Sequence, residues 1–201
     1  MQEEISKLKL RILEISYKHK LSHIGSCLTA LPIIYGIYKK KKVDEKFVLS
    51  SGHAHLAHLV VMEYCGLVDA ERMLVEYGIH CDVRAGCDVS TGSLGHGLPI
   101  ALGMAFSDKT KDVYCLTSDG ELAEGSIYEA LNIMIFKNVN NLKVFVNANG
   151  YTAYAKLEIP KSSFPIEIIR TNVNEFPFLQ GLEGHYHIMT REEYEHAKSL
   201  C

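Results

Sequence analysis

Two apolar runs, each ending in a polar residue beside a glycine, constrain the fold of this chain more than any other feature. The run DVYCLTS (112–118) leads into Asp119 and Gly120, and the run LKVFVN (142–147) leads into Asn149 and the glycine after it. Between the two runs, apolar residues recur at helical spacing: Ala123, Ile127, Ala130 and Met134. A strand, a helix and a second strand joined by short turns predict a parallel βαβ unit.

The remaining patterns extend this unit into a layered fold. Helical spacing predicts helices over 2–19, 27–38, 54–64 and 192–200, and short apolar runs predict strands over 46–50 and 166–171. We therefore expect an α/β fold in a single domain, residues 1–201, with a doubly wound, mainly parallel sheet and helices on both faces. Such a sheet binds ligands at the carboxyl ends of its strands, where Asp119 and Asn149 lie.

The composition excludes several classes of partner. The net charge is -3 and the one basic run, Lys39–Lys42, is predicted to be a solvated helix end, so electrostatic binding of nucleic acid is not expected. No stretch approaches the ~20 apolar residues of a membrane helix, and the amphipathic start of the chain does not resemble a signal peptide. Six scattered cysteines predict reduced thiols and a cytoplasmic protein.

The polar residues at the two strand ends suggest a metal site. Asp119 and Asn149 offer the oxygen ligands that Mg²⁺ prefers, and the glycines beside them allow a ligand to approach the backbone. A purely structural interpretation is that Asp119 caps the following helix and that 147–150 is only a turn. The spacing alone does not decide between the two.

Two runs contain ligand types that zinc uses. His53, His55 and His58 form His-x-His-x-x-His, while His80 lies beside Cys81 and six residues before Cys87. The first run is predicted to be helical, and zinc is not expected at either run.

Longer motifs resemble the transketolase family. SDGELAEGSIYEAL followed by NLKVFVNANGY is similar to the thiamine-diphosphate motif. Further blocks resemble transketolase motifs in the same order, namely 22–38, 47–67, Gly78–His80, 88–105, 166–171 and 184–197. Since the likeness extends along nearly the whole chain, it resembles the N-terminal, pyrophosphate-binding subunit of transketolases that are split over two genes.

The resemblance implies a cofactor site that holds thiamine diphosphate and Mg²⁺. Asp119 and Asn149 become Mg²⁺ ligands, with the carbonyl of Tyr151 as the third. His53 corresponds to a contact with the diphosphate, and Gly92 and Leu94 to contacts with the aminopyrimidine ring. The implied cofactor-binding residues are His53, Gly92, Ser93, Leu94, Asp119, Gly120, Glu121 and Asn149.

The resemblance also assigns residues to the reaction. His23, His80 and His185 correspond to histidines that line the substrate channel, where they contact substrate hydroxyls or move protons. Glu124 and Glu129 correspond to acids at a subunit interface that share protons between two active sites. The alternative for these two is a helix with two solvated carboxylates.

The implied activity is the transfer of a two-carbon ketol unit between sugars or sugar phosphates. A partner must then supply the pyrimidine-binding and C-terminal transketolase-like domains, which gives an α2β2 heterotetramer with no turnover by this chain alone. One alternative is a subunit of a split 2-oxo-acid decarboxylase or carboligase, which the channel histidines disfavour. Another is a non-catalytic subunit, against which His53 and the Asp119/Asn149 pair argue.

Several positions depart from the family pattern. Ser118 replaces a glycine, Ile24 a proline, His96 a glutamine, and Asn147 stands where aspartate is common. The family also has a further helix and strand between the asparagine motif and the segment like 166–171, so we expect this domain to be shortened and its sheet to lack an element.

Overall fold

Four parallel strands form one sheet whose carboxyl ends meet at a single edge. The computed structural model describes residues 2–152, 155–156 and 163–201. The strands lie in the order of the sequence: β1 (Lys46–Leu49), β2 (Val113–Ser118), β3 (Leu142–Ala148) and β4 (Ile166–Arg170). Their register pairs Ser118 with Asn147, so the residues that follow β2 and β3 emerge side by side.

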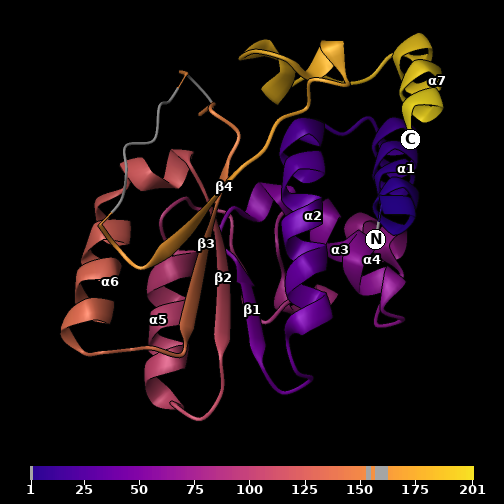
Figure 1. Ribbon diagram of the computed structural model, residues 1–201. Helices are drawn as coiled ribbons and strands as arrows, with labels where there is room; N and C mark the ends of the chain where they lie inside the picture. The colour runs from indigo at the N-terminus through magenta and orange to yellow at the C-terminus, as the bar shows by residue number, and fades with distance from the viewer. Residues whose placement is uncertain (1, 153–154, 157–162) are drawn as a thin grey trace.

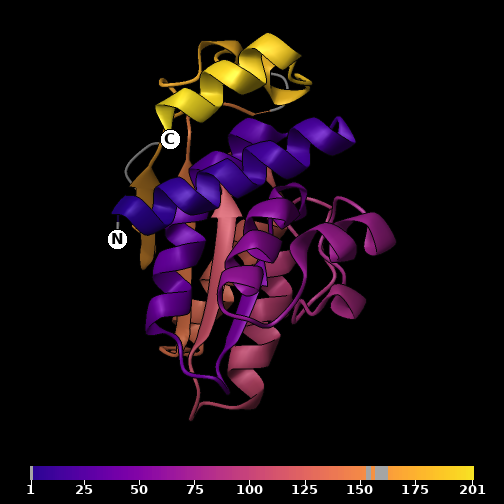
Figure 2. The same cartoon turned by 90° about the vertical axis from the view of Figure 1, so that its right-hand side faces the viewer.

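Helices cover both faces of this sheet (Figure 1). One face carries α5 (Gly97–Ser107) and α6 (Gly125–Phe136), and the other carries α2 (Ile24–Lys40). Behind α2 pack α1 (Gln2–His19), α3 (His55–Tyr64) and α4 (Ala70–Tyr77). The C-terminal segment crosses back so that α7 (Arg191–Leu200) lies against α1, as Figure 2 shows. Short 3₁₀ turns follow several of these elements: Gly52–Ala54, Val83–Ala85, Gly120–Ala123, Pro177–Leu179 and Glu183–His185.

Alternation along the strands divides the core into two clusters. Cys115 and Leu116 are adjacent and fully buried, yet Cys115 packs with α5 and α6 while Leu116 packs with the helices of the opposite face. Val48 and Leu49 divide in the same way on β1. Successive side chains of a strand point to opposite faces, and a parallel sheet covered on both faces requires apolar residues at both.

The structure confirms the predicted fold class and most of its elements. The parallel sheet with helices on both faces is present, and the predicted helices and strands lie within a few residues of their expected bounds. The capping box of Thr190 and Glu193 explains why α7 begins one residue earlier than predicted. Two helices were not predicted, α4 and α5. No described helix is long and apolar enough to cross a bilayer.

The sequence predicts that the connection between β3 and β4 is shortened. These two strands pair directly, with Val144 opposite Ile166 and Ala148 opposite Arg170. Part of the intervening segment, residues 153–154 and 157–162, lies outside the described residues.

Two glycines of α5 differ in the space around them. A Cβ atom added to Gly97 would lie 2.5 Å from the Cα atom of Ser50, whereas one added to Gly103 would meet no atom within 4 Å. We expect Gly97→Ala to lower the free energy of unfolding because it separates α5 from the end of β1. Gly103→Ala is the matched control and should raise that free energy by about 0.5–1 kcal/mol, since alanine favours a helix interior over glycine. Urea denaturation measures both changes, and equal effects would contradict the close packing at Gly97.

Candidate functional site

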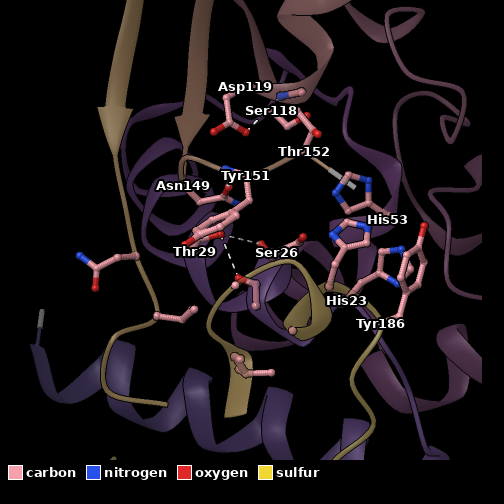
Figure 3. Close-up of a pocket in the computed structure, with 18 of the residues that line it drawn as sticks. His23, Ser26, Thr29, His53, Ser118, Asp119, Asn149, Tyr151, Thr152 and Tyr186 are labelled. Carbon is pink, nitrogen blue, oxygen red and sulfur yellow. Dashed lines mark hydrogen bonds between the residues drawn. The ribbon is translucent and has the colours of Figure 1, made fainter. Parts of the chain in front are cut away.

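A pocket of about 540 Å³ opens at the carboxyl edge of the sheet and gathers residues from distant parts of the chain. Figure 3 shows Asp119 near its top, Asn149 and Tyr151 on one side, and His23, His53 and Tyr186 on the other. The predicted residues that line it are His23, His53, His80, Gly92, Leu94, Asp119, Gly120, Glu124, Asn149, Tyr151 and His185. Three predicted site residues are not part of the lining: Ser93, Glu121 and Glu129.

Asp119 is a buried acid at the end of β2. Its carboxylate accepts hydrogen bonds from the backbone N–H of Gly150 at 2.7 Å and of Gly120 at 3.1 Å. Among the described residues, no lysine, arginine or histidine forms an ion pair with it, and burial raises its pKa. A buried carboxylate without a cationic side chain is suited to a bound metal ion, which would supply the missing countercharge.

Asn149 and Tyr151 lie beside this carboxylate at the end of β3. The amide oxygen of Asn149 accepts a hydrogen bond from the backbone N–H of Tyr151 at 3.0 Å, which fixes the turn. Two residues earlier, Asn147 donates to Thr29 of α2 at 3.0 Å and accepts from Thr171 at 2.5 Å. Asn147 therefore ties β3 to its neighbours, so an amide, which both donates and accepts, suits this position better than a carboxylate.

Glu121 lies behind the pocket and does not line it. Its carboxylate is fully buried and accepts hydrogen bonds from the Ser50 hydroxyl at 2.5 Å, the Gly95 N–H at 2.9 Å and the Ser118 N–H at 3.0 Å. The prediction that Glu121 contacts the cofactor is therefore revised, because both of its oxygens are engaged by the protein. Glu121 holds together the end of β1, the loop before α5 and the end of β2.

Three histidines form a cluster across the pocket. The ring of His23 lies 5.4 Å from that of His53 and 4.6 Å from that of His185, centroid to centroid, and Tyr186 lies edge-on to His23 at 5.4 Å. His23 adopts a left-handed conformation, with φ of 62°, before α2, and its N–H donates to the carbonyl oxygen of His185. Residues from the two ends of the chain thus share one wall, as the resemblance implied.

The cluster is electrically neutral near pH 7. Burial, followed by the neighbouring His185 and His80, lowers the pKa of His23 to about 4. Burial, followed by the other three histidines, lowers the pKa of His53 to about 3. Burial also lowers the pKa of His185. Neutral imidazoles can each accept one hydrogen bond or proton, so this wall offers acceptors to a ligand with hydroxyl groups.

Gly92 and Leu94 form another part of the wall, with His80 beside them. A Cβ atom added to Gly92 would lie 3.2 Å from the His80 ring, so glycine allows that ring to lie against the loop. Leu94 is 38% exposed and presents an apolar surface to the pocket. Ser93, between them, is exposed and does not line the pocket.

Glu124 and Glu129 are both exposed, but only Glu124 lines the pocket. Glu124 precedes α6, lines the pocket and packs close to Gly95, where an added Cβ atom would lie 2.7 Å from Cβ of Glu124. Glu129 lies within α6 and away from the pocket lining.

Some pocket residues were not predicted from the sequence. They come from α2 and the C-terminal segment, and include Ser26, Thr29, Asn172, Asn174, Gln180 and Tyr186. Ser26, Thr29 and Tyr186 lie within the 22–38 and 184–197 blocks, so the sequence offered a signal for them. Asn172, Asn174 and Gln180 lie outside the quoted blocks and reach the pocket from the C-terminal segment.

Comparison with known proteins identifies relatives of this chain. Residues 82–184, just over half of it, match the family model described as thiamine pyrophosphate enzyme, C-terminal TPP binding domain. The chain is 33% identical over 170 residues to one of the subunits of the apulose-4-phosphate transketolase of Phocaeicola vulgatus, covering 74% of this chain and 60% of that protein. It is 30% identical over 171 residues to the transketolase of Homo sapiens, covering 74% of this chain and 27% of that protein. The chain thus spans less than two thirds of the length of these relatives.

A solved structure shares the fold. The transketolase of Pichia stipitis in complex with fructose 6-phosphate superposes with a TM-score of 0.70 at 21% sequence identity, covering 77% of this chain and 28% of that one. At this identity, the likeness supports the architecture of the sheet and its helices.

The buried carboxylate behind the pocket allows a test of how the three loops are held. We expect Glu121→Ala to lower the free energy of unfolding by at least about 2 kcal/mol, because each buried donor left without an acceptor costs about 1–3 kcal/mol. Glu129→Ala, an exposed acid on α6, is the control and should change it by less than about 0.5 kcal/mol. Urea denaturation gives both values, and a loss at Glu121 no larger than the control would show that the network does not hold the loops.

Proposed function

This chain belongs to the thiamine pyrophosphate enzyme family, and we propose that it is one component of a transketolase-like enzyme that uses thiamine diphosphate and Mg²⁺. The proposed reaction transfers a two-carbon ketol unit between sugars or sugar phosphates. The relative from Phocaeicola vulgatus is named as one of the subunits of a transketolase, which supports an enzyme divided over two chains.

The observation that carries the proposal is the buried acid at the end of β2, which forms no ion pair with any described residue. The buried Asp119 carboxylate lies beside Asn149 and Tyr151, and these three residues would hold Mg²⁺ through oxygen atoms. His53 lies on the opposite side of the pocket and would then contact the diphosphate. A polar pocket at the carboxyl edge of a parallel sheet is the expected place for such a ligand.

Thiamine diphosphate, when bound, supplies the reactive carbon and the electron sink for breaking a carbon–carbon bond. The residues of this chain position that cofactor and the substrate. His23, His53, His80 and His185 line one continuous part of the pocket, and those with shifted pKa values are neutral near pH 7. Neutral imidazoles accept hydrogen bonds from sugar hydroxyls and can take a proton from one of them. This chemistry favours a sugar over a 2-oxo acid, which would be better held by cations.

The described pocket provides one wall of the cofactor site. Gly92 and Leu94 form a surface for the aminopyrimidine ring, and Leu94 remains 38% exposed on it. We propose that a partner chain with pyrimidine-binding and C-terminal transketolase-like domains covers this surface and supplies the acid that activates the ring. Catalysis then requires both chains, and the assembly is α2β2.

We further propose that two copies of this chain meet at α6. Besides the acid Glu129, and after Glu124 at its start, α6 carries exposed apolar residues: Tyr128, Ile133, Ile135 and Phe136, the last of them 78% exposed. An exposed apolar face rimmed by acids suits a contact between subunits. There the acids of two copies would be close enough to share protons between the two active sites.

The magnesium assignment is tested at Asp119. We expect Asp119→Ala to abolish detectable Mg²⁺-dependent binding of thiamine diphosphate in calorimetric titrations of the assembled enzyme, because the mutation removes the only charged ligand. Asp112→Ala, at the opposite end of the same strand, is the matched control and should bind as the wild type does. Unchanged binding by the Asp119 variant would overturn the assignment.

The same preparations test the reaction. Ketose donors and aldehyde acceptors are supplied to this chain with and without the partner, and transfer should require both chains and an intact Asp119. Without the partner, the transfer rate should fall by at least ~10²–10⁴-fold, because the loss of one acid–base group alone lowers a rate by this much. Full transfer by this chain alone would contradict the need for a partner, and transfer from 2-oxo acids but not from ketoses would contradict the proposed substrate class.

The α6 contact is tested by placing a charge in it. We expect Ile133→Glu to raise the dissociation constant of the self-association at least about tenfold, because an unpaired charge in an apolar contact costs more than the 1.4 kcal/mol that a factor of ten represents. Val75→Glu, on an exposed position of α4, is the control. Analytical ultracentrifugation measures both, and equal association of the two variants would exclude α6 as the interface.

A further inference from the structure

Two histidines and two cysteines form a buried cluster outside the pocket. His55 and His58 lie one turn apart on α3, and Cys81 and Cys87 lie at the two ends of the loop that contains the Val83–Ala85 turn. All four side chains are at most 6% exposed, and none of them lines the pocket. The cluster combines residues from the two sequence runs that contain zinc ligand types, at neither of which the sequence predicts zinc.

Three of the four residues have ligand atoms close enough together to bind one metal ion, and the fourth, His58, lies beside Cys87. Nε2 of His55 lies 3.4 Å from Sγ of Cys87, and Nδ1 of His58 lies 3.6 Å from the same sulfur atom. The ligand atoms of His55, Cys81 and Cys87 all lie within 4.8 Å of one another. Zinc bonds of about 2.0–2.1 Å to nitrogen and about 2.3 Å to sulfur, at tetrahedral angles, require nitrogen and sulfur to be about 3.5 Å apart.

In each of the two histidines, the ring nitrogen that faces away from Cys87 makes a hydrogen bond that orients the ring. Nδ1 of His55 lies 3.3 Å from the carbonyl oxygen of Gly78, and Nε2 of His58 lies 2.7 Å from the hydroxyl of Tyr38. The carbonyl oxygen can only accept, so Nδ1 of His55 carries the proton and the lone pair of Nε2 faces Cys87. Histidines that bind metals are commonly fixed in this way, by a hydrogen bond from the nitrogen that does not bind.

We propose that His55, His58, Cys81 and Cys87 bind one zinc ion in a closed, structural site. The cluster combines the ligand types and the number of ligands of structural zinc sites. Burial leaves no open position for a substrate, so the ion has a structural role.

The site would brace the loops that carry the cofactor contacts. Cys81 forms a β-bridge with Thr91, next to Gly92, and the hydroxyl of Thr91 donates to the carbonyl of Leu49 at 2.6 Å. The backbone carbonyl of Thr91 lies against Gly52, where an added Cβ atom would be only 2.3 Å away. A metal at Cys81 would therefore fix the positions of Gly92 and of His53, although neither residue would touch it.

Cobalt provides a direct test that does not depend on thiamine diphosphate. The full chain is purified under reducing, oxygen-free conditions, stripped with a chelator and titrated with Co²⁺ alone. We expect saturation at one equivalent with the intense visible bands of tetrahedral cobalt and a near-ultraviolet thiolate-to-cobalt band, both removed by one equivalent of Zn²⁺. Protein prepared from zinc-supplemented cells should contain one zinc per chain by elemental analysis.

Variants assign the signal to the four residues. We expect Cys87→Ser to weaken the thiolate band by about half, because Cys81 still binds, and to lower Co²⁺ affinity at least about tenfold, whereas Cys65→Ser, at an exposed cysteine, should leave both unchanged. Tyr38→Phe removes only the contact to His58 and should weaken binding by about 10–100-fold if His58 is a ligand. The Tyr38 variant therefore still tests the site if the cysteine variant does not fold.

Three outcomes would overturn the proposal. The first is the absence of tetrahedral bands in the wild-type chain, which would mean that the short distances are S–H···N hydrogen bonds. The second is an unchanged signal in both the Cys87 and the Tyr38 variants. The third is a Cys81–Cys87 disulfide in the freshly purified protein, seen as a mass two hydrogens lower than that of the reduced chain.

Discussion

The carboxylate of Glu121 is the interaction on which the arrangement of the site depends. It is buried, forms no ion pair with any described residue, and is stabilised by three donors, from Ser50, Gly95 and Ser118. Those donors belong to the end of β1, the loop before α5 and the end of β2, which border the pocket. A buried charge is tolerated only where hydrogen bonds replace its hydration, so the three segments have to be in place together. The pocket residues on these three segments are therefore held in place together with the segments.

The histidine wall shows how burial sets the chemistry of the site. His23 and His53 lie close enough to repel each other if both were charged, and burial removes the water that would stabilise the charged forms. The wall is therefore polar but uncharged, and it lies across the pocket from Asp119, an acid with no ion pair to any described residue. This combination suits a ligand that binds together with a metal ion and presents hydroxyl groups.

Much of this arrangement could be predicted from the sequence because strands and turns leave local signals. The runs before Asp119 and Asn149 predicted parallel strands, and their common edge followed from the topology of such sheets. The helix α5 was missed because it begins with glycine and contains a proline near its start. Glu121 was assigned to the cofactor because a motif gives residue order and not side-chain direction. The four residues of the buried cluster could not be combined, since only the packing of α3 against the loop at 81–87 brings them together.

The order of the strands has a consequence for how the chain acquires its site during synthesis. Each strand is added beside the one that precedes it, so the sheet can grow outward as the ribosome releases successive segments. The last segment then returns to the first helix, where Tyr17 stacks on Tyr194 with ring centroids 4.4 Å apart, and it carries His185 and Tyr186 across the pocket. All four strands thus precede, along the chain, the segment that carries His185 and Tyr186 to the pocket. This order allows the sheet to form before that wall of the pocket is in place.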